Sequence, residues 1–402
     1  MSPSAVTSAP YESLLDVLSK TKLTNGKPLE SNTRAILTAP KDPKHEAFIS
    51  STKAHPVDQQ LLDRFARLTG RRPHRYLRRG IVFSHHDLDA ILDRYEAGRP
   101  IYLFTGRGPS SDSLHLGHSI PFEFTQWLQE ALGAKLILML TDDMKILHDK
   151  NLAISDVRKY DIANAKDILA FGFDCSKTFM FSNIDFVGGA FYQNIISIAR
   201  HITVGSIKED LGFTDNHNVG MFYCCSTQSA GCFASSFPGI LDHDRSILRD
   251  MECLIPCSYD ISGYFAEVRK HAEDIGEKRP SFLYSSLLPS LQGGDGKMSA
   301  SISSSAIYLA DDEHVIRDKI RQAFPAGQNS MDVAFDWLRF FMEDDDELAE
   351  IQAKHQAHQL LNIELRDVLT EAILKVVRKF KTSRDEISNE TLKEYMTPRL
   401  LQ

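Results

Sequence analysis

Two histidines at the start of a helical segment are the residues best suited to chemistry in this sequence. They stand in His115-Leu-Gly-His118, three residues apart, so both imidazoles lie on one face of the first helical turn. An apolar strand ends just before them at Thr105-Gly106, and a polar loop containing Arg107 follows. Strand, loop and helix N-terminus together favour phosphate binding, because backbone N–H groups and the helix dipole attract an anion. The imidazoles add donors for charge that develops on a phosphate.

A second loop, Gly296-Lys-Met-Ser-Ala-Ser301, lies about 180 residues downstream. It combines glycine, serine hydroxyls and a single cation, Lys297, with Met298 and Ser299 directly after it. A surface lysine is usually only solvated. Here the flanking glycines and hydroxyls predict a loop that closes on a phosphate group.

The order of the elements predicts how these loops are positioned. Continuous apolar runs are typical of strands buried on both faces, and they occur at 101–105, 135–141, 178–182, 251–257 and 281–288. Helical periodicity occurs between them at 116–132, 156–170, 189–202 and 262–274. This alternation predicts an α/β fold with a Rossmann-like parallel sheet. In such a sheet, ligands bind at the carboxyl ends of the strands.

Three carboxylates follow strand ends and are therefore expected at this edge. Asp142 and Asp143 follow the second strand, where they either bind a substrate ammonium or hold a turn. Asp260 follows the fourth strand, and we expect it to accept a hydrogen bond from a ribose hydroxyl.

The chain divides into four predicted parts. Residues 1–55 form an N-terminal extension that is poor in aromatic residues, and residues 56–99 form a helical segment. Residues 100–311 form the Rossmann-type domain, interrupted by an insertion at 183–250. Residues 312–402 form a helical domain, with helices expected at 312–323, 331–343, 346–359 and 361–380.

Composition places the 402-residue chain among globular proteins, with 42% hydrophobic and 25% charged residues. No apolar run reaches the roughly 18 residues that span a bilayer, and the N-terminus lacks signal-peptide features. We therefore expect a cytoplasmic protein without membrane contact. The six cysteines form no Cys-x-x-Cys pair, which favours buried thiols and no metal site.

The net charge of −8 argues against general coating of nucleic acid but allows a local basic groove. Seven arginines between Arg64 and Arg79 form the densest basic patch. One interpretation is a salt-bridged helix face. The other is a contact with an RNA backbone or a protein partner.

The two loops together resemble the signature pair of class I aminoacyl-tRNA synthetases. Further motifs are similar to those of the eukaryotic-type tryptophanyl-tRNA synthetase family. They are Thr105-Gly-Arg-Gly-Pro-Ser-Ser111, Thr141-Asp-Asp143, Asn164-Ala-Lys-Asp-Ile168, Gly212-Phe-Thr-Asp215, Cys253-Leu-Ile-Pro-Cys257, Glu343-Asp-Asp-Asp346 and Met396-Thr-Pro-Arg399.

The resemblance implies ATP-dependent activation of an amino acid, in which the carboxylate attacks the α-phosphorus and pyrophosphate leaves. It implies ATP with Mg²⁺, tryptophan, tRNA as acceptor, an anticodon-type helical domain, and a homodimer built largely on the insertion. Positioning and charge stabilisation carry such a reaction. The catalytic residues are then His115, His118 and Lys297. The ATP-binding residues are Gly106, Arg107, Gly117, Asp260, Met298 and Ser299.

The expected amino-acid pocket departs from this family. Phe104 stands where the family commonly has Tyr, Met139 where it has Gln, Met144 where it has Glu, and Ile261 where it tends to have Gln. Gln228 is the one polar group of the pocket that remains. An indole N–H buried without an acceptor costs about 1–3 kcal/mol. The segment 322–331 is also shorter than in the family.

Three hypotheses follow from these observations. The chain is a tryptophan–tRNA ligase with a drifted pocket. Alternatively, it is a diverged paralogue that activates another aromatic or apolar amino acid and passes it to tRNA or to a small-molecule amine of specialised metabolism. The third is a pseudo-synthetase used for binding, against which the intact His115, His118 and Lys297 argue.

Overall fold

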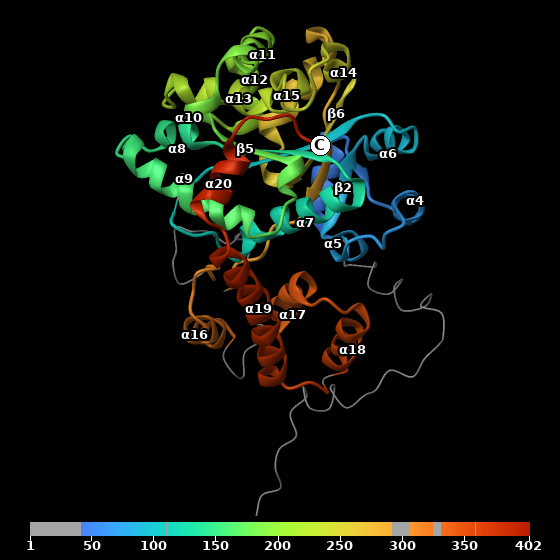
Figure 1. The fold of residues 1–402 in the computed structure, drawn as a ribbon. Helices are drawn as coiled ribbons and strands as arrows, with labels where there is room; N and C mark the ends of the chain where they lie inside the picture. Colours follow the sequence, from blue (N-terminus) through green and yellow to red (C-terminus); the bar gives the residue numbers. More distant parts are fainter. Residues whose placement is uncertain (1–41, 110, 292–305, 325–330, 358) are drawn as a thin grey trace, which may run out of the picture.

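A computed structural model describes residues 42–402 apart from 110, 292–305, 325–330 and 358 (Figure 1). Its strands are β1 (His55–Pro56), β2 (Val82–His86), β3 (Ile101–Arg107), β4 (Lys135–Leu140), β5 (Thr178–Ser182), β6 (Glu252–Ser258) and β7 (Ser281–Ser285). Within the described residues they form one sheet in the order β1-β2-β7-β6-β3-β4-β5. The five strands from β7 to β5 are parallel to one another.

The sequence predicted all five parallel strands, and the structure confirms them. Their apolar residues alternate between two cores. Leu103, Leu138 and Leu254 face one core, while Phe104, Met139 and Ile255 face the other. Both faces of the sheet are therefore covered, which explains why the strands read as continuous apolar runs.

The first half of the chain contributes helices around the sheet. They are α3 (Pro43–Thr52), α4 (Gln59–Thr69), α5 (Arg75–Arg78), α6 (Leu88–Glu96), α7 (Leu116–Leu132), α8 (Asp142–His148) and α9 (Ile154–Leu169). α7 begins and ends where the sequence predicted. Gly133 ends it in the left-handed conformation, with φ of 61°.

The insertion between β5 and β6 consists of short helices that lie above the sheet in Figure 1. They are α10 (Asn183–Phe186), α11 (Gly189–Ala199), α12 (Val204–Leu211), α13 (Val219–Ala230) and α14 (Arg245–Asp250), and α15 (Gly263–His271) follows β6. α11 and α15 pack on the same face of the sheet as Phe104 and Met139.

Two strands were not predicted. β1 spans the boundary between the predicted extension and the segment expected to be helical, and β2 lies within that segment and pairs antiparallel with β7. The stretch Val82-Phe-Ser-His-His86 has a weak strand pattern, but all five residues are buried. His86 lies within 3.0 Å of the Tyr284 hydroxyl through Nδ1, and within 3.1 Å of the Thr52 carbonyl through Nε2. Tertiary contacts therefore determine this strand.

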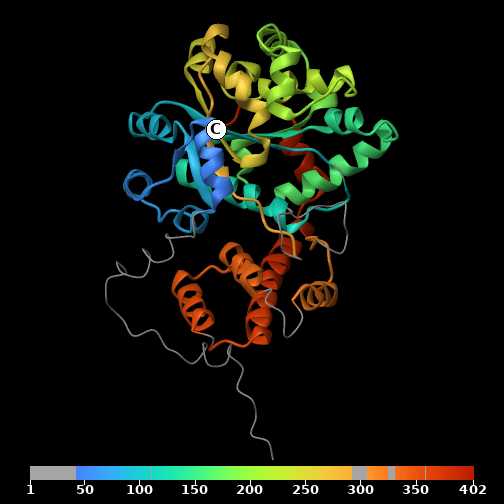
Figure 2. The same cartoon turned by 180° about the vertical axis from the view of Figure 1, so that it is seen from behind.

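The C-terminal helices form a second body below the sheet in Figures 1 and 2. They are α16 (Glu313–Ala323), α17 (Met331–Phe341), α18 (Asp345–Gln356) and α19 (Asn362–Asp385). We call these four helices the helical body. α20 (Asn389–Met396) returns to β5 instead, and the backbone N–H of Leu401 donates to the Ile240 carbonyl at 2.9 Å.

The basic patch between Arg64 and Arg79 is salt-bridged, as the first interpretation held. Asp345 at the start of α18 accepts hydrogen bonds from Arg72 (2.9 Å), Arg78 (2.7 Å) and Arg79 (2.8 Å). Arg75 contacts Glu343 at 3.1 Å. We call Arg72, Arg75, Arg78 and Arg79 with Glu343 and Asp345 the arginine clamp. It joins the helical body to the first half of the chain.

All six cysteines lie in described residues and none is bridged. Cys175 is half-buried and the other five are buried, which confirms the prediction of buried thiols. Across the part of the chain that the structure describes, no helix is both long enough and apolar enough for a bilayer.

Candidate active site

A cavity of about 630 Å³ opens at the carboxyl ends of β3, β4 and β6. The chain runs outward from β3 through β4 to β5 and then returns to β6 on the other side of β3. This is the topological switch point at which open parallel sheets bind ligands. Eleven of the predicted site residues line the cavity. They are Phe104, Gly106, Arg107, His115, Gly117, His118, Met139, Met144, Gln228, Asp260 and Ile261.

Three predicted residues, Lys297, Met298 and Ser299, lie outside the described residues. The others come from separate elements: the end of β3, the first turn of α7, the end of β4, α8, α13 and the turn after β6. The fold therefore brings together at one edge residues that are up to 157 positions apart, from Phe104 to Ile261.

His115 and His118 stack against each other, with ring centroids 3.5 Å apart and planes 23° apart. His115 occupies the N-cap of α7, and its backbone N–H donates to His118 Nδ1 at 3.3 Å. Since Nδ1 accepts this bond, a neutral His118 carries its proton on Nε2. His118 thus presents an N–H donor beside the positive end of the helix dipole, where an anion is favoured.

Gly106 is required by the close approach of β3 and β4. A Cβ at this position would lie 2.7 Å from the Met139 carbonyl oxygen, closer than real Cβ atoms come. The side-chain-free backbone leaves the end of β3 open to the cavity, where Gly106 is exposed. A ligand can therefore lie directly against this strand end.

Two cations border the loop after β3. Burial lowers the pKa of Arg107 to about 10. Burial, and then the charge of Arg107, lowers the pKa of Lys145. Lys145 Cε lies 2.6 Å from the position that a Cβ on Gly108 would take, so its side chain packs along this loop. The pair provides positive charge beside the two histidines, which suits a polyphosphate.

Lys145 was not among the predicted site residues. A signal for it existed in the sequence, because Thr141-Asp-Asp-Met-Lys145 follows a strand end and must lie at the ligand edge. In α8 the lysine stands one turn after the helix start, which turns it towards the cavity.

Asp142 and Asp143 hold a turn, the second of the two roles weighed for them. Asp142 is fully buried and accepts hydrogen bonds from the Ser182 hydroxyl and from the backbone N–H of Ile184 at 3.2 Å. Asp143 accepts from Asn183 Nδ2 at 2.9 Å. Neither carboxylate lines the cavity, so these bonds fix the start of α8 against the end of β5.

The predicted amino-acid end of the cavity is mainly apolar. Phe104 and Met139 are almost completely buried. Gln228 Nε2 donates to Met144 Sδ at 2.7 Å, and Ile261 lies at the rim, 37% exposed. The amide nitrogen of the one remaining polar residue is therefore turned to a thioether. Tyr264, which sequence reasoning missed, also lines this cavity, and burial raises the pKa of its hydroxyl.

Asp260 lies in the turn after β6, where the sequence predicted it. It is exposed and accepts a hydrogen bond from the Ser258 hydroxyl at 2.6 Å. Across the described ranges, no group of three or more His, Cys, Asp or Glu residues could hold a metal ion.

The predicted N-terminal extension also reaches the cavity. His45 on α3 lies within 3.0 Å of the Ser286 hydroxyl through Nε2, and Ser286 lines the cavity. The His45 ring stacks on Phe83 with centroids 3.7 Å apart. Burial lowers the pKa of His45, an effect that nearby Asp42 opposes. No local pattern predicted this contact, because it depends on the packing of α3 against β2.

Comparisons with known proteins agree on one family. The model of the class I tRNA synthetases for W and Y matches residues 96–218 and 260–393. The cytoplasmic tryptophan–tRNA ligase of Homo sapiens is 42% identical over 360 residues, covering 86% of this chain and 75% of that protein. The Schizosaccharomyces pombe ligase of the same name is 41% identical over 365 residues, covering 88% and 91%.

Solved structures give the same result. A tryptophanyl-tRNA synthetase from Encephalitozoon cuniculi bound to tryptophan is similar, with a TM-score of 0.79 and 32% identity, covering 88% of this chain and 100% of that chain. The tryptophanyl-tRNA synthetase from Giardia lamblia has a TM-score of 0.82 and 31% identity, covering 90% and 100%.

Proposed function

We infer the function from one premise: the chain belongs to the class I tRNA synthetases for tryptophan and tyrosine, and among them to the tryptophanyl-tRNA synthetases. It is a ligase that activates an amino acid with ATP. We propose that the amino acid is tryptophan and that the acceptor is tRNA. The relatives named as cytoplasmic support the proposal that it works in the cytoplasm.

One observation carries the proposed site: eleven of the residues predicted from the sequence line one cavity at the switch point of the sheet. In the proposed reaction, the amino-acid carboxylate attacks the α-phosphorus of ATP. A P–O bond forms, pyrophosphate leaves with the electron pair of the broken bond, and an aminoacyl-adenylate results. Little proton transfer is needed, so charge stabilisation governs the rate.

We assign roles by charge and position. His118 Nε2–H and the α7 N-terminus stabilise charge on the phosphates, with His115 holding the ring of His118. Arg107 and Lys145 supply positive charge along the polyphosphate. Gly106 and Gly117 let the nucleotide lie against the backbone, and Asp260 accepts a hydrogen bond from a ribose hydroxyl. Lys297, Met298 and Ser299 are proposed to meet the leaving pyrophosphate.

Mg²⁺ is proposed to enter bound to the ATP phosphates. Asp260 is the one carboxylate among the described residues that line the cavity, so these residues offer no cage of oxygen ligands. The ion would neutralise phosphate charge, while the protein residues orient the nucleotide.

The test is amino-acid-dependent exchange between ATP and labelled pyrophosphate. Tryptophan should support exchange, and His118→Ala should lower kcat about 100- to 1,000-fold, the effect of losing one preorganised donor. Charging of total tRNA with tryptophan tests the acceptor. A folded wild-type protein that shows no exchange with any amino acid would refute the enzymatic proposal and leave the pseudo-synthetase.

The apolar pocket supports a second candidate, a paralogue that activates another aromatic or apolar amino acid. The specific observation is the Gln228–Met144 contact, which turns the amide nitrogen of Gln228 to a thioether. Exchange measured with all twenty amino acids separates the two candidates. Exchange with tryptophan together with charging of its tRNA eliminates the paralogue. Exchange with a different amino acid and no charging eliminates the tryptophan ligase.

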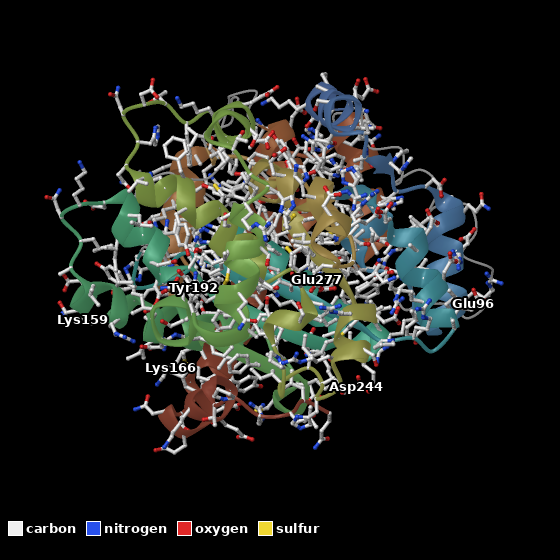
Figure 3. The ribbon with its side chains drawn as sticks, turned by 90° about the horizontal axis from the view of Figure 1, so that it is seen from above. Glu96, Lys159, Lys166, Tyr192, Asp244 and Glu277 are labelled. Atoms are coloured by element: carbon white, nitrogen blue, oxygen red, sulfur yellow. The ribbon has the colours of Figure 1, made fainter. Side chains whose placement is uncertain are left out.

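A homodimer is proposed through α11 and α13. Their exposed apolar side chains include Tyr192 (49% exposed), Ile196 (41%), Val219 (86%) and Tyr223 (41%). Burial and the neighbouring Tyr192 raise the pKa of Tyr223. Figure 3 looks down on the face of the molecule that carries these helices and labels Tyr192.

Sedimentation velocity tests this proposal. Ile196→Asp should shift the protein from dimer to monomer, because it buries a charge in the proposed interface. Ile162→Asp on α9 is the matched control, since Ile162 is 54% exposed and lies away from α11. A wild-type monomer, or a dimer that Ile196→Asp leaves intact, argues against this surface.

The domain division is also a proposal. We assign nucleotide and amino-acid binding to residues 100–311 and anticodon-end binding of tRNA to the helical body. Lys375 and Lys379 are exposed on α19 and are candidates for phosphate contacts. Replacing both with Glu should lower tRNA charging but leave pyrophosphate exchange unchanged. Equal loss of both activities would contradict this division.

A further inference from the structure

Residues 114–116, which lead into the first turn of α7, are held in place by residues far away in the sequence. The Leu116 backbone N–H donates to the Ile307 carbonyl at 2.9 Å, and the Leu309 N–H donates to the Leu114 carbonyl at 2.8 Å. Residues 114–116 and 307–309 thus form a short antiparallel bridge centred on His115 and Tyr308. The backbone that carries His115 is therefore fixed on one side by this bridge.

On its other side, the loop is held by a buried carboxylate. Asp167 Oδ2 on α9 accepts the backbone N–H of Leu114 at 3.1 Å. Its second oxygen, Oδ1, accepts Arg384 Nε at 2.5 Å. Asp167 is only 1% exposed, and Leu114 is fully buried. A single side chain therefore connects the residue before His115 to the last turn of α19.

Arg384 belongs to the helical body, and two lysines of that body contact residues that flank the bridge. Lys319 on α16 donates to the Ala306 carbonyl at 2.8 Å and to Asp311 Oδ2 at 2.6 Å. Lys381 on α19 donates to the Asp311 carbonyl at 2.8 Å. Asp311 in turn accepts the Tyr308 N–H at 2.9 Å. Lys319 and Lys381 thus contact residues on either side of 307–309, while Arg384 reaches the 114–116 segment through Asp167.

The Asp167 contact differs from an ordinary surface ion pair. Burial raises the pKa of Asp167, and the hydrogen bonds from Arg384 and from the Leu114 N–H oppose this effect. Without Arg384, the carboxylate would be buried with a backbone N–H as its main partner, which favours a protonated or displaced side chain. Either change would move the Leu114 backbone, and His115 follows directly in the chain.

We propose that Asp167 is a positioning residue for amino-acid activation, through which Arg384 of the helical body sets the placement of His115 and His118. Asp167 lies outside the cavity and touches no reacting group; it acts through the Leu114 N–H. Through this contact, a ligand that moves α19 changes the activation rate. The proposal rests on the activation reaction proposed above.

Steady-state pyrophosphate exchange tests the proposal with four single variants and one double variant. Asp167→Asn keeps an acceptor for Leu114 but removes the charge. Arg384→Met removes the cation, and Arg384→Lys restores a charge without the planar fork. Arg378→Met is the matched control, because Arg378 lies on the same helix and pairs at the surface with Glu313.

We expect Asp167→Asn and Arg384→Met to lower kcat about 10- to 100-fold, while KM for ATP and for the amino acid changes less than about threefold. A misplaced donor weakens the transition state more than the ground state. Arg384→Lys should recover part of kcat, and Arg378→Met should match the wild type. The double variant Asp167→Asn/Arg384→Met should be no slower than the slower single variant, because both act through one contact.

The outcomes separate the two proposals. A wild type without exchange refutes the proposed function. A wild type with exchange, together with Asp167→Asn and Arg384→Met variants that match Arg378→Met, overturns the positioning role. The positioning role is also overturned if the loss of kcat parallels the fall in the thermal unfolding midpoint and disappears when the assay is run at 10 °C. The contact would then only stabilise the fold.

Discussion

Replacing Asp345 should weaken the attachment of the helical body to the rest of the protein. Asp345 is 6% exposed and pairs with Arg79, which is completely buried, and with Arg78, which is 12% exposed. Arg79 also donates to the carbonyls of Arg339 and Met342, both at 2.7 Å. Asp345→Asn keeps the shape of the side chain but leaves these guanidinium groups without a counter-charge.

The expected loss is about 3–5 kcal/mol of unfolding free energy, the cost of removing one partner of a buried ion pair. With a urea slope of about 3 kcal/mol per M, the unfolding midpoint falls by about 1 M or more. Asp346→Asn is the matched control, because Asp346 is the next residue and is exposed. We expect it to change the unfolding free energy by less than about 0.5 kcal/mol.

Urea unfolding followed by tryptophan fluorescence measures this effect. The chain has two tryptophans, and Trp337 on α17 is fully buried in the helical body. In a Trp127→Phe background, the signal comes from Trp337 alone. Its indole N–H donates to the Pro289 carbonyl at 3.2 Å, so it reports the contact between the helical body and the Rossmann-type domain. If the unfolding free energy of Asp345→Asn lies within about 1 kcal/mol of that of Asp346→Asn, the reasoning is refuted.

The difference in unfolding free energy between the Asp345→Asn and Asp346→Asn variants should depend on pH. Burial alone would raise the pKa of Asp345, but the charges of Arg79 and Arg78 outweigh burial and hold the pKa below its ordinary value. A depressed pKa means that the stabilisation is present above the unfolded pKa of about 3.9 and is lost as the pH falls through the folded pKa. The difference in unfolding free energy between the two variants should therefore become smaller below about pH 3.9.

Two further predictions concern buried groups. Gly231→Ala should cost about 1–3 kcal/mol and raise KM for the amino acid, because its Cβ would lie 2.2 Å from Phe104 Cζ. Phe104→Leu in the same chain should reverse both effects, and unchanged kinetics would contradict the contact. Burial, and then Asp142, raises the pKa of Asp161 to about 8. A raised pKa means that stability falls as the pH rises from about 4 to 8, by at most about 1.4 kcal/mol per unit. Asp161→Asn should remove this slope in urea unfolding, and an unchanged slope would exclude Asp161 as its origin.

Much of the fold was predictable because local patterns and tertiary structure agree. The five parallel strands are buried on both faces, so their apolar runs are unbroken. The site followed from a rule about sheets. Residues after strand ends meet at one edge, which brought Gly106 and Asp260 to one cavity although no local contact joins them.

Other features were not predictable, because they depend on partners that the local sequence does not indicate. β2 forms because β7 offers it an edge, and His45 reaches Ser286 because α3 packs beside β2. From the sequence, the basic patch between Arg64 and Arg79 had two interpretations. The structure favours the salt-bridged one, because Asp345 lies next to Arg79. The roles of Asp142 and Asp143 were likewise open until Ser182, Asn183 and Ile184 were seen to bind them.

The sequence by itself determined the five parallel strands, the phosphate-binding loop and the family, because each depends on residue types at short spacing or on motifs that can be compared directly. Only the tertiary structure decided which charges are partners. Asp167 and Arg384 are 217 positions apart, and no periodicity links them. Their pairing depends on where α9 and α19 pack, which is a property of the whole core. For the same reason, the sequence identified His115 and His118, while the structure identified what holds them in place.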